Sequence, residues 1–400
     1  MENEEVKPTI AEASPAKVTN SSHVVMADSV KAEEVPTISI KDLQTISELH
    51  PEVLVHSVAS TKRVSMPTPL VVQPAEYRHS IGEWMQIWRD GMRLVYLPLA
   101  LAPALLGSLL AWAQTVTHQT PLGQFHILHF IATIAALCFV QIGANLLNDY
   151  YDYLRGIDTG NPLGPGGLIQ QGLIKPALVL IFGLSLLGLG AVIGILAALR
   201  GGPLVLLFGL VGVLCAYFYS ATLRSLSSLA LGELVSFCIF GPLITLGAYM
   251  VQAGPSMANL LSVLLYSLIP GFLAVAVIHA NNIRDFEGDE HAKKYTLAVL
   301  LGPRWSKLLY LLLVAAAYTV VLILGLPHGA PHLLLITFWT LPGAIIMVTG
   351  MLRTDIMQSQ HLVLRQTLRL GAFFTFLLLA ALFVNTLIPV LPEIPLELFR

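Results

Sequence analysis

Residues 145–152 read Asn-Leu-Leu-Asn-Asp-Tyr-Tyr-Asp, and residues 281–289 read Asn-Asn-Ile-Arg-Asp-Phe-Glu-Gly-Asp. Each stretch follows a long run of apolar residues, and a further carboxylate, Asp158, comes after the first stretch. Charged residues make up only 12% of the 400-residue chain, whereas hydrophobic residues make up 55%. Because carboxylates at the ends of apolar helices are costly in a membrane protein, we interpret the two stretches as halves of one functional site.

The apolar runs around these stretches have the length of membrane spans. A helix of roughly 20 apolar residues crosses a hydrocarbon core about 30 Å thick. Nine such runs are present, at about 94–114, 125–147, 176–198, 203–222, 229–251, 259–280, 306–326, 331–351 and 369–390. The sequence therefore predicts an all-α, polytopic membrane protein of about nine transmembrane helices. The net charge of −2 gives no indication of nucleic-acid binding.

Basic residues are distributed unevenly between the two ends of the predicted spans. If the N-terminus is cytoplasmic, the cytoplasmic loops and their flanks carry Arg155, Lys175, Arg224, Arg284, Lys293, Lys294, Arg304, Lys307, Arg353, Arg365 and Arg369. The opposite side carries only Arg200 and the terminal Arg400. Since basic residues accumulate in cytoplasmic loops, this asymmetry predicts an N-in, C-out topology in the cell membrane, with both carboxylate clusters facing the cytoplasm.

Residues 1–80 differ in composition from the rest of the chain. They are rich in Glu, Lys, Ser, Thr, Val and Pro and poor in aromatic residues, which is typical of a disordered cytoplasmic tail. No apolar segment long enough for a secretory signal precedes the first span. Residues 81–93, which include Trp84 and Trp88, predict an interfacial helix leading into that span. Residues 81–400 are therefore expected to form the membrane domain.

The spacing within each cluster places its polar residues on one helix face, because residues three and four positions apart are neighbours. The residues concerned are Asn145, Asn148, Asp149 and Asp152 in the first cluster, and Asn281, Asn282, Asp285 and Asp289 in the second. Facing carboxylates repel each other unless a cation lies between them. Mg²⁺ takes one or two carboxylates and fills its other positions with phosphate oxygens and water. The clusters thus predict a site for Mg²⁺ and a diphosphate; the alternative is that they cap helix ends and solvate the membrane interface.

Basic and aromatic residues accompany the clusters. On the same predicted side lie the basic residues Arg93, Arg224, Lys293 and Lys294 and the tyrosines Tyr150, Tyr151, Tyr153, Tyr217 and Tyr219. Guanidinium and ammonium groups are the usual partners of a diphosphate, and a tyrosine ring face stabilises a nearby carbocation. The alternatives are that the basic residues only hold loops in the cytoplasm and that the tyrosines belong to the ordinary interfacial aromatic belt.

The two motifs resemble those of the UbiA-type intramembrane prenyltransferase superfamily. Its first motif, Asn-x-x-x-Asp followed by another Asp, is similar to Asn148, Asp152 and Asp158, and its second, Asp-x-x-x-Asp, is similar to Asp285 and Asp289. The resemblance extends over roughly residues 81–390.

Within this superfamily, the string NDYYDYLRGID at 148–158 most resembles the 1,4-dihydroxy-2-naphthoate branch, which makes menaquinone. Residues 164–174, 219–242 and 281–302 also resemble that branch. Departures from the family pattern at Leu94, Ala221 and Tyr295 bear on the acceptor more than on the reaction class.

The resemblance implies a helical bundle around a central cavity and an enzyme that moves a polyprenyl chain from its diphosphate to an aromatic acceptor, with Mg²⁺ as cofactor. The implied metal ligands are Asp149, Asp152, Asp285 and Asp289, supported by Asn148 and Asn282. The implied diphosphate partners are Arg93, Arg224, Lys293 and Lys294, and the implied aromatic shield includes Tyr151 and Tyr219. Asp152 and Asp285 would be catalytic, and Asp158 would take up the ring proton.

Other functions stay open at this point. Acceptors of the 4-hydroxybenzoate, homogentisate, chlorophyllide or glycerol phosphate type are alternatives to the naphthoate. A membrane transporter also carries intramembrane carboxylates and internal repeats, but such groups lie near the membrane midplane rather than at helix ends. A membrane scaffold with vestigial clusters is a third reading. Because a polyprenyl tail is as apolar as lipid, the enzyme reading predicts a cavity that opens sideways to the bilayer.

Overall fold

The computed structural model describes residues 80–116, 123–156, 168–222, 225–255, 259–327 and 331–390. All regular elements within these ranges are helices, apart from one isolated bridge between Leu229 and Tyr295. Eight helices in the described part of the chain are long and apolar enough to cross a membrane. The predicted all-α, polytopic membrane fold is therefore confirmed. The proposed tail at 1–80 lies outside the described residues, except for Ser80.

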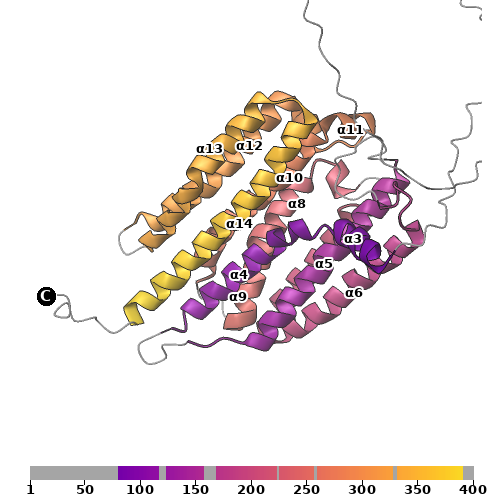
Figure 1. The fold of residues 1–400 in the computed structure, drawn as a ribbon. Coiled ribbons are helices and arrows are strands. Elements are labelled where there is room, and N and C mark those ends of the chain that lie inside the picture. The colour runs from indigo at the N-terminus through magenta and orange to yellow at the C-terminus, as the bar shows by residue number, and fades with distance from the viewer. Residues whose placement is uncertain are drawn as a thin grey trace, which may run out of the picture. The chain divides into compact units, whose positions relative to one another are not determined.

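The predicted spans correspond to the following helices (Figure 1). In chain order they are α4 (Leu97–Ala113, preceded by η1 at Leu94–Tyr96), α5 (Ile127–Leu154), α6 (Pro176–Gly201), α7 (Pro203–Phe218), the series α8 (Gly232–Cys238), η3 (Ile239–Leu243) and α9 (Ile244–Ala253), then α10 (Leu260–Arg284), α12 (Leu297–Gly325), the pair η4 (His332–Thr340) and α13 (Leu341–Arg353), and α14 (Met357–Leu387). Smaller elements are α3 (Ile81–Gly91), η2 (Leu226–Ser228), α11 (Phe286–His291) and η5 (Ile388–Val390).

Helix α7 is apolar but shorter than the helices that are long enough to cross a membrane. It has 16 residues, about 24 Å of helix, whereas the hydrocarbon core is about 30 Å thick. Gly202, with φ of +86°, ends α6, and Pro203 begins α7 at its first position. Glycine adopts a positive φ without steric strain, and proline is favoured in the first turn of a helix. The count of nine spans depends on α7 and stays a prediction, as does the orientation.

Several helices extend beyond the apolar runs from which they were predicted. Helix α5 continues to Leu154, so the first motif lies in its last turns. Helix α14 begins at Met357, twelve residues before the predicted span, and α12 begins at Leu297 with a non-helical Gly302 (φ +75°) before Pro303. The added ends of α5 and α14 are polar, so hydropathy marks the membrane core rather than the helix end.

Helix packing brings segments distant in sequence side by side. Helix α5 packs along α6, α4 along α9, and α10 along α12 and α14. The α4–α9 contact is close at Gly107, where a Cβ atom would lie 2.1 Å from the carbonyl oxygen of Thr245. Only glycine permits this approach, as is common where membrane helices touch.

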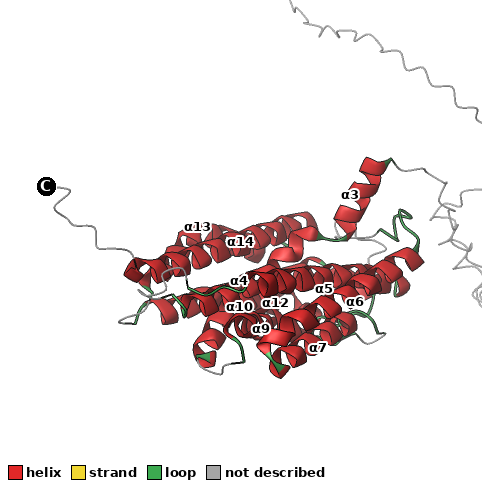
Figure 2. Ribbon diagram, turned by 90° about the horizontal axis from the view of Figure 1, so that it is seen from below, coloured by secondary structure: helices red, strands yellow, loops and turns green. Residues whose placement is uncertain are grey.

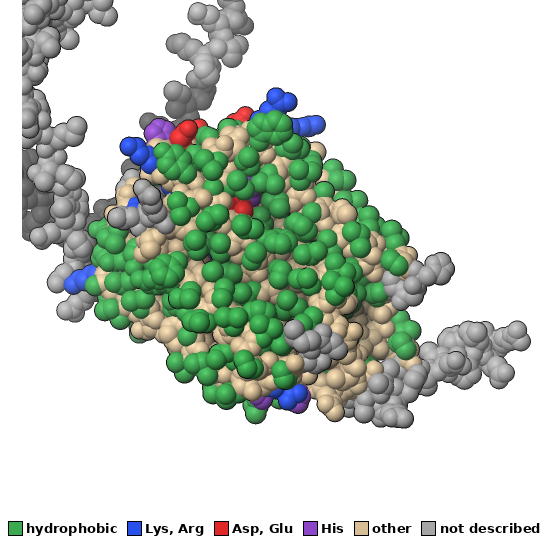
Figure 3. Space-filling model, turned by 180° about the vertical axis from the view of Figure 1, so that it is seen from behind, with side chains coloured by type: hydrophobic (Ala, Val, Ile, Leu, Met, Phe, Trp, Pro, Cys, Tyr) green, Lys and Arg blue, Asp and Glu red, His purple; other side chains and the backbone are tan. Residues whose placement is uncertain are grey.

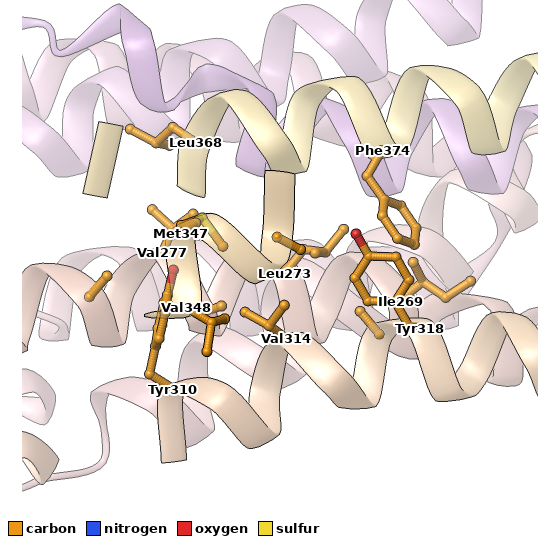
Figure 4. Close-up of a cluster of buried hydrophobic side chains, with 14 of the residues drawn as sticks. Ile269, Leu273, Val277, Tyr310, Val314, Tyr318, Met347, Val348, Leu368 and Phe374 are labelled. Carbon is orange, nitrogen blue, oxygen red and sulfur yellow. The ribbon is translucent and has the colours of Figure 1, made fainter. Parts of the chain in front are cut away.

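The largest buried cluster joins α10, α12, α13 and α14 (Figure 4). Tyr318 packs edge-to-face on Phe374 with ring centroids 5.1 Å apart. Two buried tyrosine hydroxyls are satisfied: Tyr310 bonds Thr367 at 2.8 Å, and Tyr318 bonds Thr340 at 2.6 Å. These bonds matter because an unsatisfied polar group in an apolar interior is costly.

The outer surface carries a broad band of hydrophobic side chains between ends where charged side chains gather (Figure 3). The short helix α3 projects beside the bundle (Figure 2) and begins with a capping box in which Ser80 and Glu83 bond each other's backbone. Trp88 of α3 packs edge-on against Phe182 of α6, with ring centroids 4.8 Å apart. The helix predicted for 81–93 is thus present up to Gly91, and its interfacial position stays a prediction.

Candidate active site

The first motif is organised around Asn148 near the end of α5. Its amide oxygen accepts a hydrogen bond from Nη1 of Arg93 at 2.9 Å. Its amide nitrogen donates to Oδ2 of Asp152 at 3.0 Å and to the hydroxyl of Ser220 at 2.9 Å. One side chain therefore links the segment before α4, the motif carboxylate and the end of α7.

Arginines hold both carboxylates of this motif. Arg155 pairs with Asp152 at 2.6 Å and donates to the Ser225 hydroxyl at 2.9 Å, so it ties α5 to the segment before α8. Arg93 lies 3.7 Å from Asp149 and has a left-handed backbone with φ of +53°. That conformation is uncommon for a residue with a side chain, and it turns the chain from α3 into η1 directly beside the motif.

Contrary to the prediction from spacing, the four polar residues of the second motif do not share one continuous helix, because the helix breaks at Asp285. Asn281 and Asn282 lie at the end of α10, and Asp289 lies in the separate short helix α11.

The contacts of the second motif nevertheless have a similar pattern. Arg284 donates to both carboxylate oxygens of its neighbour Asp285, at 2.7 and 2.6 Å, and to the amide oxygen of Asn281 at 3.0 Å. Asn281 in turn donates to Asp285 at 3.0 Å. Beyond α11, Lys294 pairs with Asp289 at 3.2 Å. All four described motif carboxylates thus have a basic partner.

A single cavity of about 820 Å³ joins the two motifs. Its polar end is formed by Arg93, Asn145, Asn148, Asp152, Tyr219, Asn281, Asn282, Arg284, Asp285 and Lys294. The remainder is lined mainly by apolar side chains and glycines of α4 to α7, η3 and α9. This arrangement suits a ligand with an anionic head and a long apolar tail.

The apolar part of the cavity reaches the outside of the bundle. Four residues of its wall on α6 and α7 are between 49% and 57% exposed: Ile195, Leu206, Leu207 and Leu210. Side chains that line a cavity and also lie at the lipid-facing surface mark an opening toward the bilayer. This agrees with the sideways opening expected for a lipid-like substrate.

The predicted site residues are placed as follows. Seven line the cavity: Arg93, Asn148, Asp152, Tyr219, Asn282, Asp285 and Lys294. Asp149 and Asp289, each 2% exposed, lie outside its lining and pair with Arg93 and Lys294. Lys293 is exposed, and the hydroxyl of Tyr151 lies 3.4 Å from that of Tyr217. Asp158 and Arg224 lie outside the described residues. The roles of all these residues stay predictions.

Sequence reasoning did not select Arg155 or Arg284 as site residues, although both contact motif carboxylates. Their positions three residues after Asp152 and one before Asp285 were the available signal. An ion pair at such short spacing depends on the side-chain rotamers, so spacing alone does not separate it from a topogenic arginine.

The donor set at the polar end fits Mg²⁺ that arrives with a diphosphate. No group of three or more His, Cys, Asp or Glu side chains in the described part of the chain is arranged to hold a metal ion. Mg²⁺ needs only one or two protein carboxylates when phosphate oxygens and water complete its shell. Asp152 and Asp285 supply one carboxylate from each motif, and Asn148 and Asn282 supply amide groups.

Tyr219, just after α7, keeps its proton in this site. Burial, aided by the negative charges of Glu233 and Asp152, raises the pKa of Tyr219 to about 12, against an opposing effect of Lys294. The phenol is therefore neutral at physiological pH, and Tyr219 is part of the cavity lining.

Comparisons with known proteins identify the family that this chain resembles. The model of the UbiA prenyltransferase family matches residues 100–364. A 1,4-dihydroxy-2-naphthoate octaprenyltransferase of Bacillus subtilis is 29% identical over 78% of this chain and 96% of its own length. The enzyme of the same name from Mycobacterium tuberculosis is 34% identical over 60% of this chain and 79% of its own length.

A solved UbiA homologue from Archaeoglobus fulgidus, bound to GPP and Mg²⁺, has a similar fold with a TM-score of 0.51. The alignment has 16% sequence identity and covers 75% of this chain and 99% of that one. A helical membrane bundle with two Asp motifs at one apolar cavity, together with these matches, defines a multi-pass membrane enzyme that transfers prenyl groups. The chain belongs to the UbiA prenyltransferase family.

Proposed function

We propose that this enzyme transfers a polyprenyl chain from its diphosphate to 1,4-dihydroxy-2-naphthoate, as a step of menaquinone biosynthesis. The observation that carries the proposal is the single cavity with both Asp motifs at its polar end and an apolar remainder. The bacterial relatives described above, both named as enzymes for this acceptor, support the choice of acceptor.

The diphosphate head is proposed to bind at the polar end. Asp152 and Asp285 would hold Mg²⁺ there, with Asn148 and Asn282 beside them. When bound, Mg²⁺ neutralises charge on the diphosphate as it leaves. Arg93 and Lys294, both in the cavity lining, add fixed positive charge for the same purpose.

The chemistry at the cavity then needs few protein groups. The bond between the prenyl carbon and the diphosphate oxygen breaks, and its electron pair leaves on the diphosphate. The electron-rich ring supplies the pair for the new carbon–carbon bond, and the attacked carbon loses its proton. Apolar walls exclude water from the allylic cation, and the neutral ring of Tyr219 stabilises it. Asp158 is proposed to take up the proton.

We also propose that the polar end of the cavity faces the cytoplasm of the cell. This orientation is supported by the distribution of basic residues. Many lie at the helix ends near the motifs, whereas Arg200 lies at the other end. Asp355 is exposed between α13 and α14. In sealed, right-side-out vesicles the Asp355→Cys variant should then react with an impermeant maleimide only after the membranes are opened. Labelling in sealed, right-side-out vesicles would contradict the orientation.

The acceptor is tested by competition in membranes that contain the protein. With a labelled polyprenyl diphosphate and Mg²⁺, 1,4-dihydroxy-2-naphthoate should be prenylated far faster than 4-hydroxybenzoate or homogentisate. Prenylation of another acceptor alone would retain the enzyme class and reject menaquinone biosynthesis.

A further inference from the structure

A buried polar network lies behind the polar end of the cavity. Glu233 in the first turn of α8 is 4% exposed, and His279 of α10 is fully buried. One oxygen of Glu233, Oε1, lies 2.9 Å from Nδ1 of His279 and 2.9 Å from the amide nitrogen of Asn282. Asn282 lines the cavity, but Glu233 and His279 do not.

The hydrogen bonds of this network determine where its protons lie. Nε2 of His279 lies 3.0 Å from the backbone carbonyl of Ser306 in α12, and a carbonyl only accepts, so Nε2 carries a hydrogen. One further proton then lies between Nδ1 and Glu233, either on the ring or on the carboxyl. In both cases the pair has no net charge, which is what burial requires.

This arrangement also fixes the amide of Asn282. Because Glu233 Oε1 accepts from the amide nitrogen, the nitrogen is turned to the network and the carbonyl oxygen of Asn282 is left to the cavity. A carbonyl oxygen is a ligand of the kind that Mg²⁺ prefers, directly or through a bound water. An amide turned the other way would present hydrogen-bond donors to the cation instead.

We infer that Glu233 and His279 are positioning residues that hold the carbonyl oxygen of Asn282 toward the Mg²⁺-diphosphate. The inference rests on the proposed function of the cavity. The anchor is rigid because it joins three helices: α8 through Glu233, α10 through His279 and α12 through Ser306.

Substituting Glu233→Gln should reverse the orientation of the Asn282 side-chain amide. The new amide would donate to Nδ1 of His279, and Asn282 would then have to turn its own oxygen to the network, away from the cavity. Adding Asn282→Asp should compensate, because a carboxylate at this position has an oxygen for each side and accepts from the new amide. Asn282→Asp alone should be harmful, because it replaces the N–H group that donates to Glu233 Oε1 with a second acceptor oxygen.

The test uses the full-length protein in lipid nanodiscs and an unreactive geranylgeranyl S-thiolodiphosphate. The readout is the Mg²⁺ concentration that gives half-maximal binding of the analogue, measured by calorimetry. The thermal midpoint of each variant is measured in parallel. We expect Glu233→Gln and Asn282→Asp each to raise this concentration at least about 10-fold, as for other residues that orient a metal ligand. The double variant should return to within about 3-fold of wild type, well inside that loss.

Tyr310→Phe is the matched control, since it removes a buried hydrogen bond to Thr367 far from the cavity lining. It should lower the thermal midpoint and leave the Mg²⁺ dependence unchanged. If Glu233→Gln does not fold, comparison of Asn282→Asp with the double variant still tests the compensation.

The positioning role would be overturned if the double variant required as much Mg²⁺ for half-maximal binding as Asn282→Asp alone. It would also be overturned if the two single variants, like Tyr310→Phe, left the Mg²⁺ dependence unchanged. If wild type binds the analogue and transfers prenyl groups, such a result rejects this inference alone. A wild type that binds no analogue rejects the proposed function, and the inference with it.

Discussion

At the residue scale, each motif carboxylate in the described part of the site has a basic partner. Asp152 and Asp285 are bound tightly by the adjacent Arg155 and Arg284, at 2.6 Å in each case. These arginines balance the charge of the buried carboxylates. Uncompensated buried charge is strongly destabilising, so loss of either arginine should destabilise the fold.

The buried phenol of Tyr219 gives a prediction about alkaline pH. Its folded pKa of about 12 exceeds the ordinary value of 10.0, so folding favours the protonated phenol. This contribution to stability is complete below pH 10 and is lost as the pH rises toward 12. Between these values the thermal midpoint of wild type should fall more steeply than that of Tyr219→Phe. Tyr153→Phe, at an exposed position, is the control, and parallel curves for wild type and Tyr219→Phe would contradict the buried phenol.

At the element scale, hydropathy and motif spacing predicted most of the bundle. Every apolar run corresponds to a helix, and seven of the proposed site residues line one cavity. Hydropathy did not predict the polar helix ends at Leu154 and Met357, because it carries no signal beyond the hydrocarbon core, whereas the motif spacing predicted helix through Asp152. Nor did it predict the bond between Glu233 and His279, which depends on how α8 packs against α10.

The close contact of α4 with α9 is predicted to depend on one glycine. Gly107→Ala would place a methyl group against the backbone of Thr245 and should cost about 1–3 kcal/mol of stability. Gly188→Ala in α6 is the matched control, since its Cβ would have nothing within 4 Å, and it should be neutral or slightly stabilising. Thermal unfolding in detergent measures both. Equal midpoints for the two variants would show that α4 and α9 are not packed as described.

At the scale of the whole molecule, the cavity links chemistry at a helix end to the lipid phase. In the proposed function the polar end binds the head of the substrate, and the wall at α6 and α7 reaches the outer surface of the bundle. The length of chain that this wall accommodates should therefore determine which prenyl diphosphates are used. No catalytic group is needed along the wall, because the tail only has to be solvated by apolar side chains.

A larger side chain in this wall should select against long chains. Gly209 lines the cavity, and a Cβ atom added to it would have nothing within 4 Å, so Gly209→Phe would fill space without a clash at its first carbon. Its kcat/KM for a C40 diphosphate, relative to a C10 diphosphate, should fall at least about 10-fold. Gly188→Phe, on α6 outside the cavity lining, should leave the ratio unchanged. The same ratio for both variants would place the prenyl tail elsewhere.

The central claim is that one carboxylate from each motif acts at a shared Mg²⁺-diphosphate site, and the most direct test is prenyl transfer by membranes that carry the protein. With labelled polyprenyl diphosphate and 1,4-dihydroxy-2-naphthoate, transfer should require Mg²⁺ and stop with EDTA. Asp152→Ala and Asp285→Ala should each reduce it at least about 100-fold, whereas the exposed Asp90→Ala should not. Transfer that persists in EDTA, or in either motif variant at equal protein level, would contradict the account.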